Sequence, residues 1–199
     1  MTGTLVDADA RLVRIAESVR AHSPSMAERD EPFLEAAVAL ILRPTGHGVE
    51  LLFIKRASRD DDPWSGQIAL PGGRYDMDDE SLEATAVRET FEEVDLDLRA
   101  HGFIIGALDE VRPRTPVLPP VIVRPYVAIV SADVALVPSP EVAELFWAPL
   151  DRVFDPLATR DTDMVVRSVS TRRPAIHYRG HIIWGMTEQI LRSLSSIIA

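Results

Sequence analysis

The segment from Ser81 to Val94 constrains this chain more than any other, because it crowds like charges at helical spacing. Glu89, Glu92 and Glu93 stand at i, i+3 and i+4, so an α-helix brings their side chains to one patch. Ser81 is a good N-cap for this helix. The predicted apolar stripe on the opposite side consists of Ala84, Val87, Phe91 and Val94. Such a patch is commonly a solvated acidic face, or it holds a hard divalent cation that offsets the repulsion.

The composition excludes several classes of protein. With 199 residues, 46% of them hydrophobic, the chain is long enough to bury the core of one domain. A formal net charge of -10 disfavours nonspecific attraction to nucleic acid or to an anionic membrane surface. The absence of cysteine rules out disulfides, thiolate zinc sites and cysteine nucleophiles. Because neither a signal sequence nor a membrane-spanning run is visible, we expect a cytoplasmic protein that binds neither nucleic acid nor a membrane.

Strand-like and helix-like segments are mixed along the chain, which is typical of an α/β protein. Residues 9–21 indicate an amphipathic helix, and residues 35–44 and 49–56 indicate two strands joined by the turn TGHG. Further strands are predicted at 101–111, 121–130, 164–170 and 173–185, a strand turning into a helix at 141–154, and a closing helix at 186–198. The proline-rich stretch 112–120 has too few backbone donors for a central strand, so we expect a loop there.

Around the acidic helix the chain resembles the Nudix hydrolase family, whose signature is written GX5EX7REUXEEXGU, with U a bulky aliphatic residue. Seven residues separate Glu80 from Arg88, as the signature asks. The matching residues are, in order, Gly73, Glu80, Arg88, Glu89, Glu92, Glu93 and Leu96. There are three departures: six residues instead of five follow Gly73, Thr90 takes an aliphatic position, and Asp95 replaces a glycine. Asp tolerates the left-handed conformation expected at that helix end.

The resemblance implies a fold, a cofactor and a reaction. The fold would be a Nudix α/β/α sandwich with a mixed central sheet at residues 31–199, a helix-and-loop extension at 1–30 and an extra C-terminal helix. The family cleaves a nucleoside diphosphate linked to another moiety, by water attack on phosphorus. The implied ligands of Mg²⁺ or Mn²⁺ are Glu89, Glu92, Glu93 and the carbonyl of Gly73. Glu92, Glu93 and Arg88 would be catalytic, Arg88 by orienting a glutamate, while Glu80 would support the helix start.

The wider context resembles a narrower branch of the family that includes the coenzyme A pyrophosphatases. The shared features are a basic pair after an apolar run, then GQ, PGG and the aspartates Asp76 and Asp79, and the similarity extends from about Ala36 to Leu194. Coenzyme A or a related nucleoside diphosphate derivative is therefore the implied small-molecule substrate. The stretch DDDPWSG lacks the arginine and histidine usual in that branch. ADP-ribose and nucleotide sugars thus stay open as substrates, and so does a non-catalytic nucleotide-sensing domain.

Several residues outside the signature have both a functional and a structural interpretation. Glu144 precedes LFWAPL, where many Nudix enzymes place an additional acid that binds metal or serves as the base, but a surface carboxylate is almost as common. The candidates for phosphate contacts are Arg56, Arg74 and Arg112. Arginine forks match phosphate oxygens, although a solvated surface arginine is the more frequent case. Many Nudix proteins are dimers, so a homodimer is an open alternative to a monomer.

Overall fold

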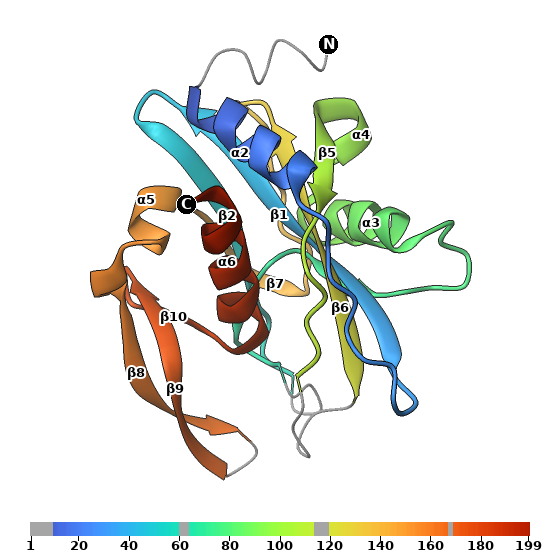
Figure 1. Ribbon diagram of the computed structural model, residues 1–199, viewed down its shortest axis with the longest axis vertical. Coiled ribbons are helices and arrows are strands. Elements are labelled where there is room, and N and C mark those ends of the chain that lie inside the picture. The colour runs from blue at the N-terminus through green and yellow to red at the C-terminus, as the bar shows by residue number, and fades with distance from the viewer. Residues whose placement is uncertain (1–9, 60–63, 114–119, 167–168) are drawn as a thin grey trace.

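The computed structural model describes residues 10–59, 64–113, 120–166 and 169–199, arranged as in Figure 1. The helices are α2 (Ala10–Ala21), α3 (Leu82–Val94), α4 (Leu98–His101), α5 (Leu150–Val153) and α6 (Gly185–Ile198), with a short 3-10 helix at Pro156–Ala158. The strands are β1 (Leu34–Thr45), β2 (Gly48–Arg56), β3 (Ile68–Ala69), β4 (Gly72–Arg74), β5 (Gly102–Ala107), β6 (Val121–Val130), β7 (Val142–Pro149), β8 (Thr159–Val166), β9 (Val169–Tyr178) and β10 (His181–Trp184). None of the helices in these described ranges is long and apolar enough to cross a membrane. Most of the predicted proline-rich loop, residues 114–119, lies outside the described residues.

The central sheet contains seven strands among the described residues, in the order β3-β2-β1-β6-β5, with β4 paired to β1 and β7 paired to β2. β1 and β6 run parallel, whereas the other pairs are antiparallel. One edge of β1 is shared by two strands, since β2 pairs with residues 42–45 and β4 with residues 36–38. The sheet is therefore mixed, and the glycines of β4 lie beside the first half of β1.

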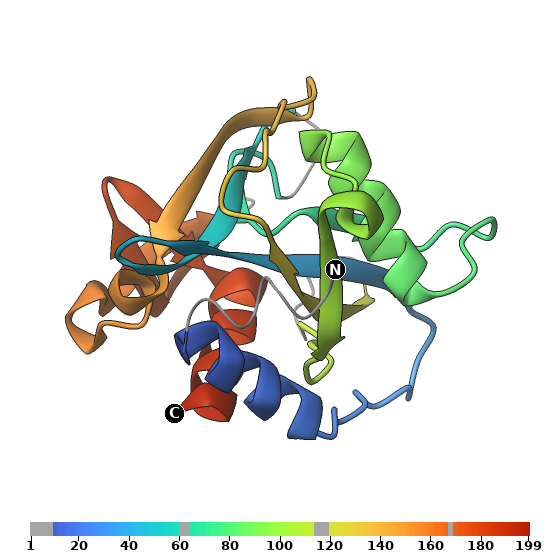
Figure 2. The ribbon, with the colours of Figure 1, turned by 90° about the horizontal axis from the view of Figure 1, so that it is seen from above.

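Helices cover both faces of this sheet, and Figure 2 shows α3 on one side with α2 and α6 on the other. Each face has its own apolar core. Leu40 packs with residues of α2 and α6, while its neighbour Ile41 packs with residues of α3. Successive residues of a strand point to opposite faces, so the nearly continuous apolar run of β1 supplies both cores. The α/β/α sandwich with a mixed central sheet is thus confirmed.

The N-terminal helix α2 belongs to the same core as the sheet, through Leu12, Ile15, Ala16 and Val19. The loop that follows it is fastened to the segment after β5. Asp109 accepts hydrogen bonds from the Ser25 backbone at 2.7 Å and from the Ser25 hydroxyl at 2.9 Å. This loop is therefore held against the domain by side-chain bonds instead of strand pairing.

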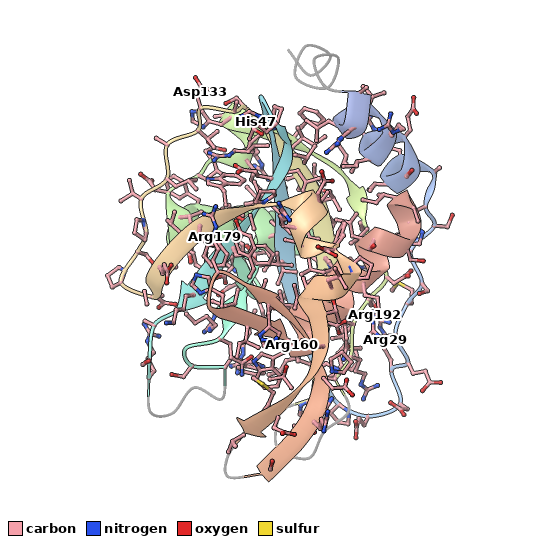
Figure 3. The ribbon with its side chains drawn as sticks, turned by 90° about the vertical axis from the view of Figure 1, so that its left-hand side faces the viewer. Arg29, His47, Asp133, Arg160, Arg179 and Arg192 are labelled. Carbon is pink, nitrogen blue, oxygen red and sulfur yellow. The ribbon has the colours of Figure 1, made fainter. Side chains whose placement is uncertain are left out.

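The last third of the chain adds a three-stranded antiparallel sheet, β10-β9-β8, and the helix α6. Figure 3 shows the β8–β9 hairpin extending away from the end of the molecule that carries His47 and Asp133. α6 packs on the central sheet through Ile190, Leu191 and Leu194. The hairpin and the beginning of α6 consequently lie together at one end of the domain.

The predicted apolar stripe of α3 is partly wrong. Phe91 is 53% exposed, whereas Ala86, Thr90 and Val94 are fully buried. The helix is rotated about its axis relative to that prediction, so that Glu93, only 4% exposed, faces inward with the apolar residues. The rotation has a physical cause, because the Glu93 carboxylate accepts a backbone hydrogen bond from β4.

Candidate active site

α3 begins and ends at polar side chains that satisfy its backbone. The Ser81 hydroxyl accepts a hydrogen bond from the Ala84 N–H at 3.2 Å. Asp95 adopts the left-handed conformation, with φ 55°, and its N–H donates to the Phe91 carbonyl. Thr90 is buried, and its hydroxyl donates to the Ala86 carbonyl at 2.7 Å. Asp95 and Thr90 therefore fit positions where the signature has a glycine and an aliphatic residue.

Two glycines bring the backbone of β4 against the carboxylates of α3. Gly72 has φ +150°, and a Cβ there would lie 2.3 Å from the Ala37 carbonyl oxygen. Its N–H donates to Glu93 Oε2 at 2.9 Å. A Cβ on Gly73 would lie 2.4 Å from the carboxyl carbon of Glu89. Glycine at both positions is what allows the two carboxylates to sit against this strand.

Arg88 fixes the orientation of the α3 carboxylates. Its Nε and Nη2 donate to the two oxygens of Asp79, each at 2.9 Å. Its Nη1 donates to Glu89 at 2.8 Å and to Glu92 at 3.3 Å. The hydrogen bonds from Arg88, with a further one from the Thr85 hydroxyl, hold the pKa of Asp79 well below its usual range. Asp79 is therefore an ionised anchor for the arginine.

A cavity of about 760 Å³ opens beside α3 and β4. We call one part of it the charged end, lined by Glu89, Glu93, Glu141, Arg56, Arg59 and Arg74. Arg56 Nη1 lies 3.8 Å from Glu93 Oε1, and Arg59 Nη2 lies 3.0 Å from Glu141 Oε1. Gly72 and Gly73 also line the cavity. The charged end thus brings carboxylates and arginines into one space.

Two carboxylates of the charged end resist ionisation. Burial raises the pKa of Glu93 to about 7, despite the bond from Gly72 and the nearby Arg56. Burial also raises the pKa of Glu89 against the opposing effect of Arg88, and the negative charge of Glu141 raises both values further. The nearby arginines therefore do not offset the cost of burying these two carboxylates as anions. Buried carboxylate oxygens next to a backbone carbonyl form a donor set that suits a hard divalent cation.

Comparison with known proteins agrees with this chemistry. The NUDIX domain model matches residues 32–167. The chain belongs to the Nudix family. An uncharacterized Nudix hydrolase, NudL, of Pectobacterium atrosepticum is 31% identical over 153 residues, which cover 75% of this chain and 76% of that protein. An uncharacterized protein of Schizosaccharomyces pombe is 54% identical over 61 residues, but the match covers 30% of this chain and 18% of that protein.

Solved Nudix structures share the fold of this Nudix domain. A MutT/nudix family protein from Enterococcus faecalis superposes with a TM-score of 0.56 at 18% identity, covering 86% of this chain and 64% of that one. An Ap4A hydrolase from C. elegans gives a TM-score of 0.51 at 20% identity, covering 59% and 81%. The family match and the NudL relative, in turn, show that the protein is a hydrolase that acts on phosphorus-containing anhydrides. Nudix hydrolases generally use divalent metal ions.

The acid before α3 that binds Arg88 in the structure is Asp79 and not Glu80. Glu80 matches when residues are counted back from Arg88, but its side chain is exposed. Asp79 makes the bidentate pair with Arg88, and five residues separate it from Gly73, as the signature asks. Counting five intervening residues from Gly73 would have identified Asp79 from the sequence. The extra residue therefore lies after the anchoring acid instead of before it.

The predicted patch of three glutamates is divided in the structure. Glu89 and Glu93 line the cavity, whereas the side chain of Glu92 is 56% exposed and does not line it. Within the described residues, no three His, Asp or Glu side chains converge on one point. Arg88 Nη1 nevertheless bridges Glu89 and Glu92, so Glu92 stays close to Glu89 at the exposed edge of the site.

Glu144 is not brought to the charged end. In the sheet it lies opposite Lys55, whose neighbour Arg56 faces Glu93 of α3. Since successive strand residues alternate between faces, Glu144 lies on the face away from α3. Its carboxylate is instead 3.3 Å from His181 Nε2 of β10. The predicted role as base or metal ligand is therefore not supported by its position.

Glu141 and Arg59, which are not among the predicted site residues, line the cavity where Glu144 was expected. Glu141 stands just before β7, lines the cavity and is paired with Arg59. A shift of register in β2 and β7 between Lys55 and Arg56 separates its position from that of Glu144. Sequence spacing alone carries no signal of such a shift.

Of the three arginines predicted to bind phosphate, two line the cavity and one does not. Arg56 and Arg74 line the cavity. Arg112 is only 4% exposed and binds Asp30 at 2.5 Å and Glu31 at 2.7 Å. Its guanidinium therefore fastens the loop after α2 and is not available to a phosphate.

Proposed function

We propose that this protein is a metal-dependent pyrophosphohydrolase that uses Mg²⁺ or Mn²⁺ to cleave the diphosphate of coenzyme A or a related nucleoside diphosphate derivative. The observation that carries the proposal is the charged end of the cavity. There, Glu89 and Glu93 have raised pKa values beside Arg56, Arg59 and Arg74. An acidic protein needs such a site, because its net charge of -10 otherwise repels an anionic substrate.

The residues that would hold the cation are Glu89, Glu93 and the Gly73 carbonyl, with Glu92 contributing from the exposed flank. A bound divalent cation neutralises phosphate charge and lowers the pKa of a coordinated water. The carboxylates must be ionised to bind it, and their raised pKa values are the expected signature of a site that is completed by a positive charge.

The chain's own side chains would do the remaining work. Arg56, Arg59 and Arg74 would bind and orient the phosphates through charge-assisted hydrogen bonds. Arg88, fixed by Asp79, would position Glu89. Glu141 lines the same space and is the candidate to accept a proton from the attacking water. Phosphoryl transfer depends mainly on positioning and charge neutralisation, which this arrangement supplies.

Coenzyme A is the first expected substrate, because of the chain's resemblance to the coenzyme A pyrophosphatase branch. ADP-ribose and nucleotide sugars share the same diphosphate and are the alternatives. The decisive experiment incubates the full chain with coenzyme A, ADP-ribose, NADH, nucleotide sugars and nucleoside triphosphates, with Mg²⁺, with Mn²⁺ and with a chelator. Coenzyme A should give 3',5'-ADP and 4'-phosphopantetheine in a metal-dependent reaction. Failure to cleave any member with either metal would refute the proposal.

A matched pair of variants on α3 tests the metal site. Glu93→Gln keeps the size of the side chain but removes the charge, so kcat/KM should fall by at least about 100-fold. Glu83→Gln makes the same change on the exposed first turn of the helix, where no effect is expected. Equal activity of the two variants would refute the assignment of Glu93.

A further inference from the structure

The cavity continues beyond the charged end along an apolar part of the central sheet. Ala36 and Val38 of β1 and Val121 and Val123 of β6 line it. Ala36 is paired with Val123 in the parallel ladder, so these side chains lie side by side. Ala36, Val121 and Val123 belong to the core on the face of α2 and α6, and Val38 packs against it. The floor of this part is therefore aliphatic.

Residues from the last third of the chain form the opposite wall. Met186 and Ile190 stand one turn apart on α6, and both line the cavity. Thr171 and Arg173 of β9 line it as well. The hairpin and α6 lie next to each other in Figure 1. This wall lies outside residues 32–167, which match the Nudix model, so it is an addition to the common domain.

We infer that the space between Met186, Ile190 and the β1–β6 floor, which we call the apolar subsite, binds an aliphatic group carried by the substrate's second phosphate. This rests on the proposed function, because the diphosphate must occupy the charged end. The enzyme accordingly prefers nucleoside diphosphates esterified to an aliphatic chain over those joined to a sugar.

The chemistry of the floor favours such a chain over a sugar, while the polar lining residues Ser170, Thr171, Arg173 and Gln189 stand on the opposite wall. A sugar ring laid on the valine and alanine floor would lose hydrogen bonds to water, which is costly without replacement partners. The buried hydroxyl of Thr187, which also lines the cavity, already donates to the Ile68 carbonyl at 3.2 Å. Arg173 Nε donates to the Thr171 hydroxyl at 3.2 Å. An aliphatic chain needs no such partner and gains about 0.8 kcal/mol for each methylene removed from water.

The probe is a series of ADP esters with methanol, butanol and octanol on the β-phosphate, compared with ADP-ribose. Water attacks one phosphorus and the bridging P–O bond breaks, so each ester yields AMP, an alkyl phosphate and, with both monoesters fully ionised, two protons. AMP release with excess Mg²⁺ gives kcat/KM for each ester. The apolar subsite predicts a rise of up to about fourfold per methylene until the cavity is filled, with ADP-ribose below the octyl ester.

Variants locate the effect in the wall. Met186→Gln places an amide in the subsite and should lower the octyl-to-methyl ratio of kcat/KM by about tenfold, whereas Met186→Leu should preserve the ratio. Ser196→Asn, an exposed change on the same helix and away from this cavity, should also preserve it. Leu34→Gln is a second test if Met186→Gln does not fold, because Leu34 lines the cavity but is 42% exposed.

The outcomes separate the two proposals. A profile that is flat or falls with chain length, in a protein that cleaves the methyl ester, overturns the apolar subsite and leaves the proposed function standing. An unchanged ratio in folded Met186→Gln and Leu34→Gln overturns the assignment to this wall. No cleavage of any ester, of ADP-ribose or of coenzyme A with either metal overturns the proposed function, and the subsite with it.

Discussion

Two clusters of arginine and buried carboxylate among the described residues differ in how completely the carboxylate is satisfied. The first, which we call the Glu110 cluster, joins Glu110 to Arg29, Arg124 and the backbone of Ala27. The Glu110 side chain is 0% exposed, and each of its oxygens accepts at least one hydrogen bond. Burial alone would raise the pKa of Glu110, but these donors hold it below its usual value.

The second, the α3 cluster, consists of Asp79, Arg88, Glu89 and Glu93. Arg88 satisfies Asp79, but Glu89 and Glu93 keep raised pKa values because burial outweighs their hydrogen bonds. A cluster closed on itself fastens two segments of chain. A cluster whose carboxylates face a cavity and stay costly to ionise is incomplete, and this is the reason that we propose it as the metal site.

Removing the Glu110 carboxylate from the Glu110 cluster should have the largest effect on stability. Glu110→Ala leaves two guanidinium groups and a backbone N–H without their acceptor, so the free energy of unfolding should fall by about 3 kcal/mol or more. Urea denaturation measures it. The control is Asp151→Ala, because Asp151 is 69% exposed in its pair with Arg11 and should change stability by less than about 1 kcal/mol. Equal effects in the two variants would contradict the contrast between a buried and an exposed pair.

Removing the Glu93 carboxylate from the α3 cluster should raise the free energy of unfolding instead of lowering it. The folded-state pKa of Glu93, about 7, lies above the ordinary value of 4.5. Ionising it in the folded protein therefore costs free energy that is absent below pH 4.5, grows between pH 4.5 and 7 and is complete above pH 7. In metal-free protein at pH 8, Glu93→Gln should raise the free energy of unfolding by up to about 3 kcal/mol.

The pH dependence is the sharper part of that test. The gain from Glu93→Gln should shrink as the pH falls from 7 and vanish near pH 4.5, because the native carboxyl is then neutral as well. Urea denaturation in chelator at several pH values measures it, with Glu83→Gln as the control. A gain that is independent of pH would show that the burial of a charge is not its origin.

Local features of α3 could be predicted from the sequence. The start of α3 at Ser81 and the left-handed end at Asp95 depend on neighbouring residues, and both are confirmed. The rotation of α3 could not be predicted, because the stripe that includes Phe91 is more apolar than the face that is buried, which contains Thr85, Thr90 and Glu93. A hydrogen bond from Gly72, 21 residues earlier, decides between them.

The positions of Glu144 and Arg112 away from the charged end have a common physical reason. Both depend on contacts between segments that are far apart in the chain. A register shift in the β2–β7 pair brings Glu141 and not Glu144 to the cavity. Arg112 binds acids more than 80 residues earlier, and nothing in its local sequence distinguishes a structural arginine from one that binds phosphate.

The anchor of the α3 cluster should matter for activity more than for folding. Asp79→Asn keeps the shape but weakens the grip on Arg88, so Glu89 loses its fixed orientation. We expect a 10–100-fold lower apparent affinity for the activating metal, about the effect of losing a residue that orients a ligand. Glu80→Gln, an equivalent change at the exposed neighbour, should leave the metal dependence unaltered. The measurement is the initial rate against Mg²⁺ concentration. A larger effect of Glu80→Gln than of Asp79→Asn would indicate that Glu80 is the acid of the signature.

The smallest expected difference in activity is between variants of two neighbouring glutamates. Glu141 lines the cavity, and Glu144 lies on the face of the sheet away from α3. Glu141→Gln removes a charge that lies close enough to raise the pKa values of Glu89 and Glu93, and removes the candidate proton acceptor, so kcat should fall by about tenfold or more. Glu144→Gln alters only a pair with His181 and should change kcat less than about twofold. A larger loss of kcat in Glu144→Gln than in Glu141→Gln would contradict this assignment. It would place the base on the face of the sheet away from α3 and its carboxylates.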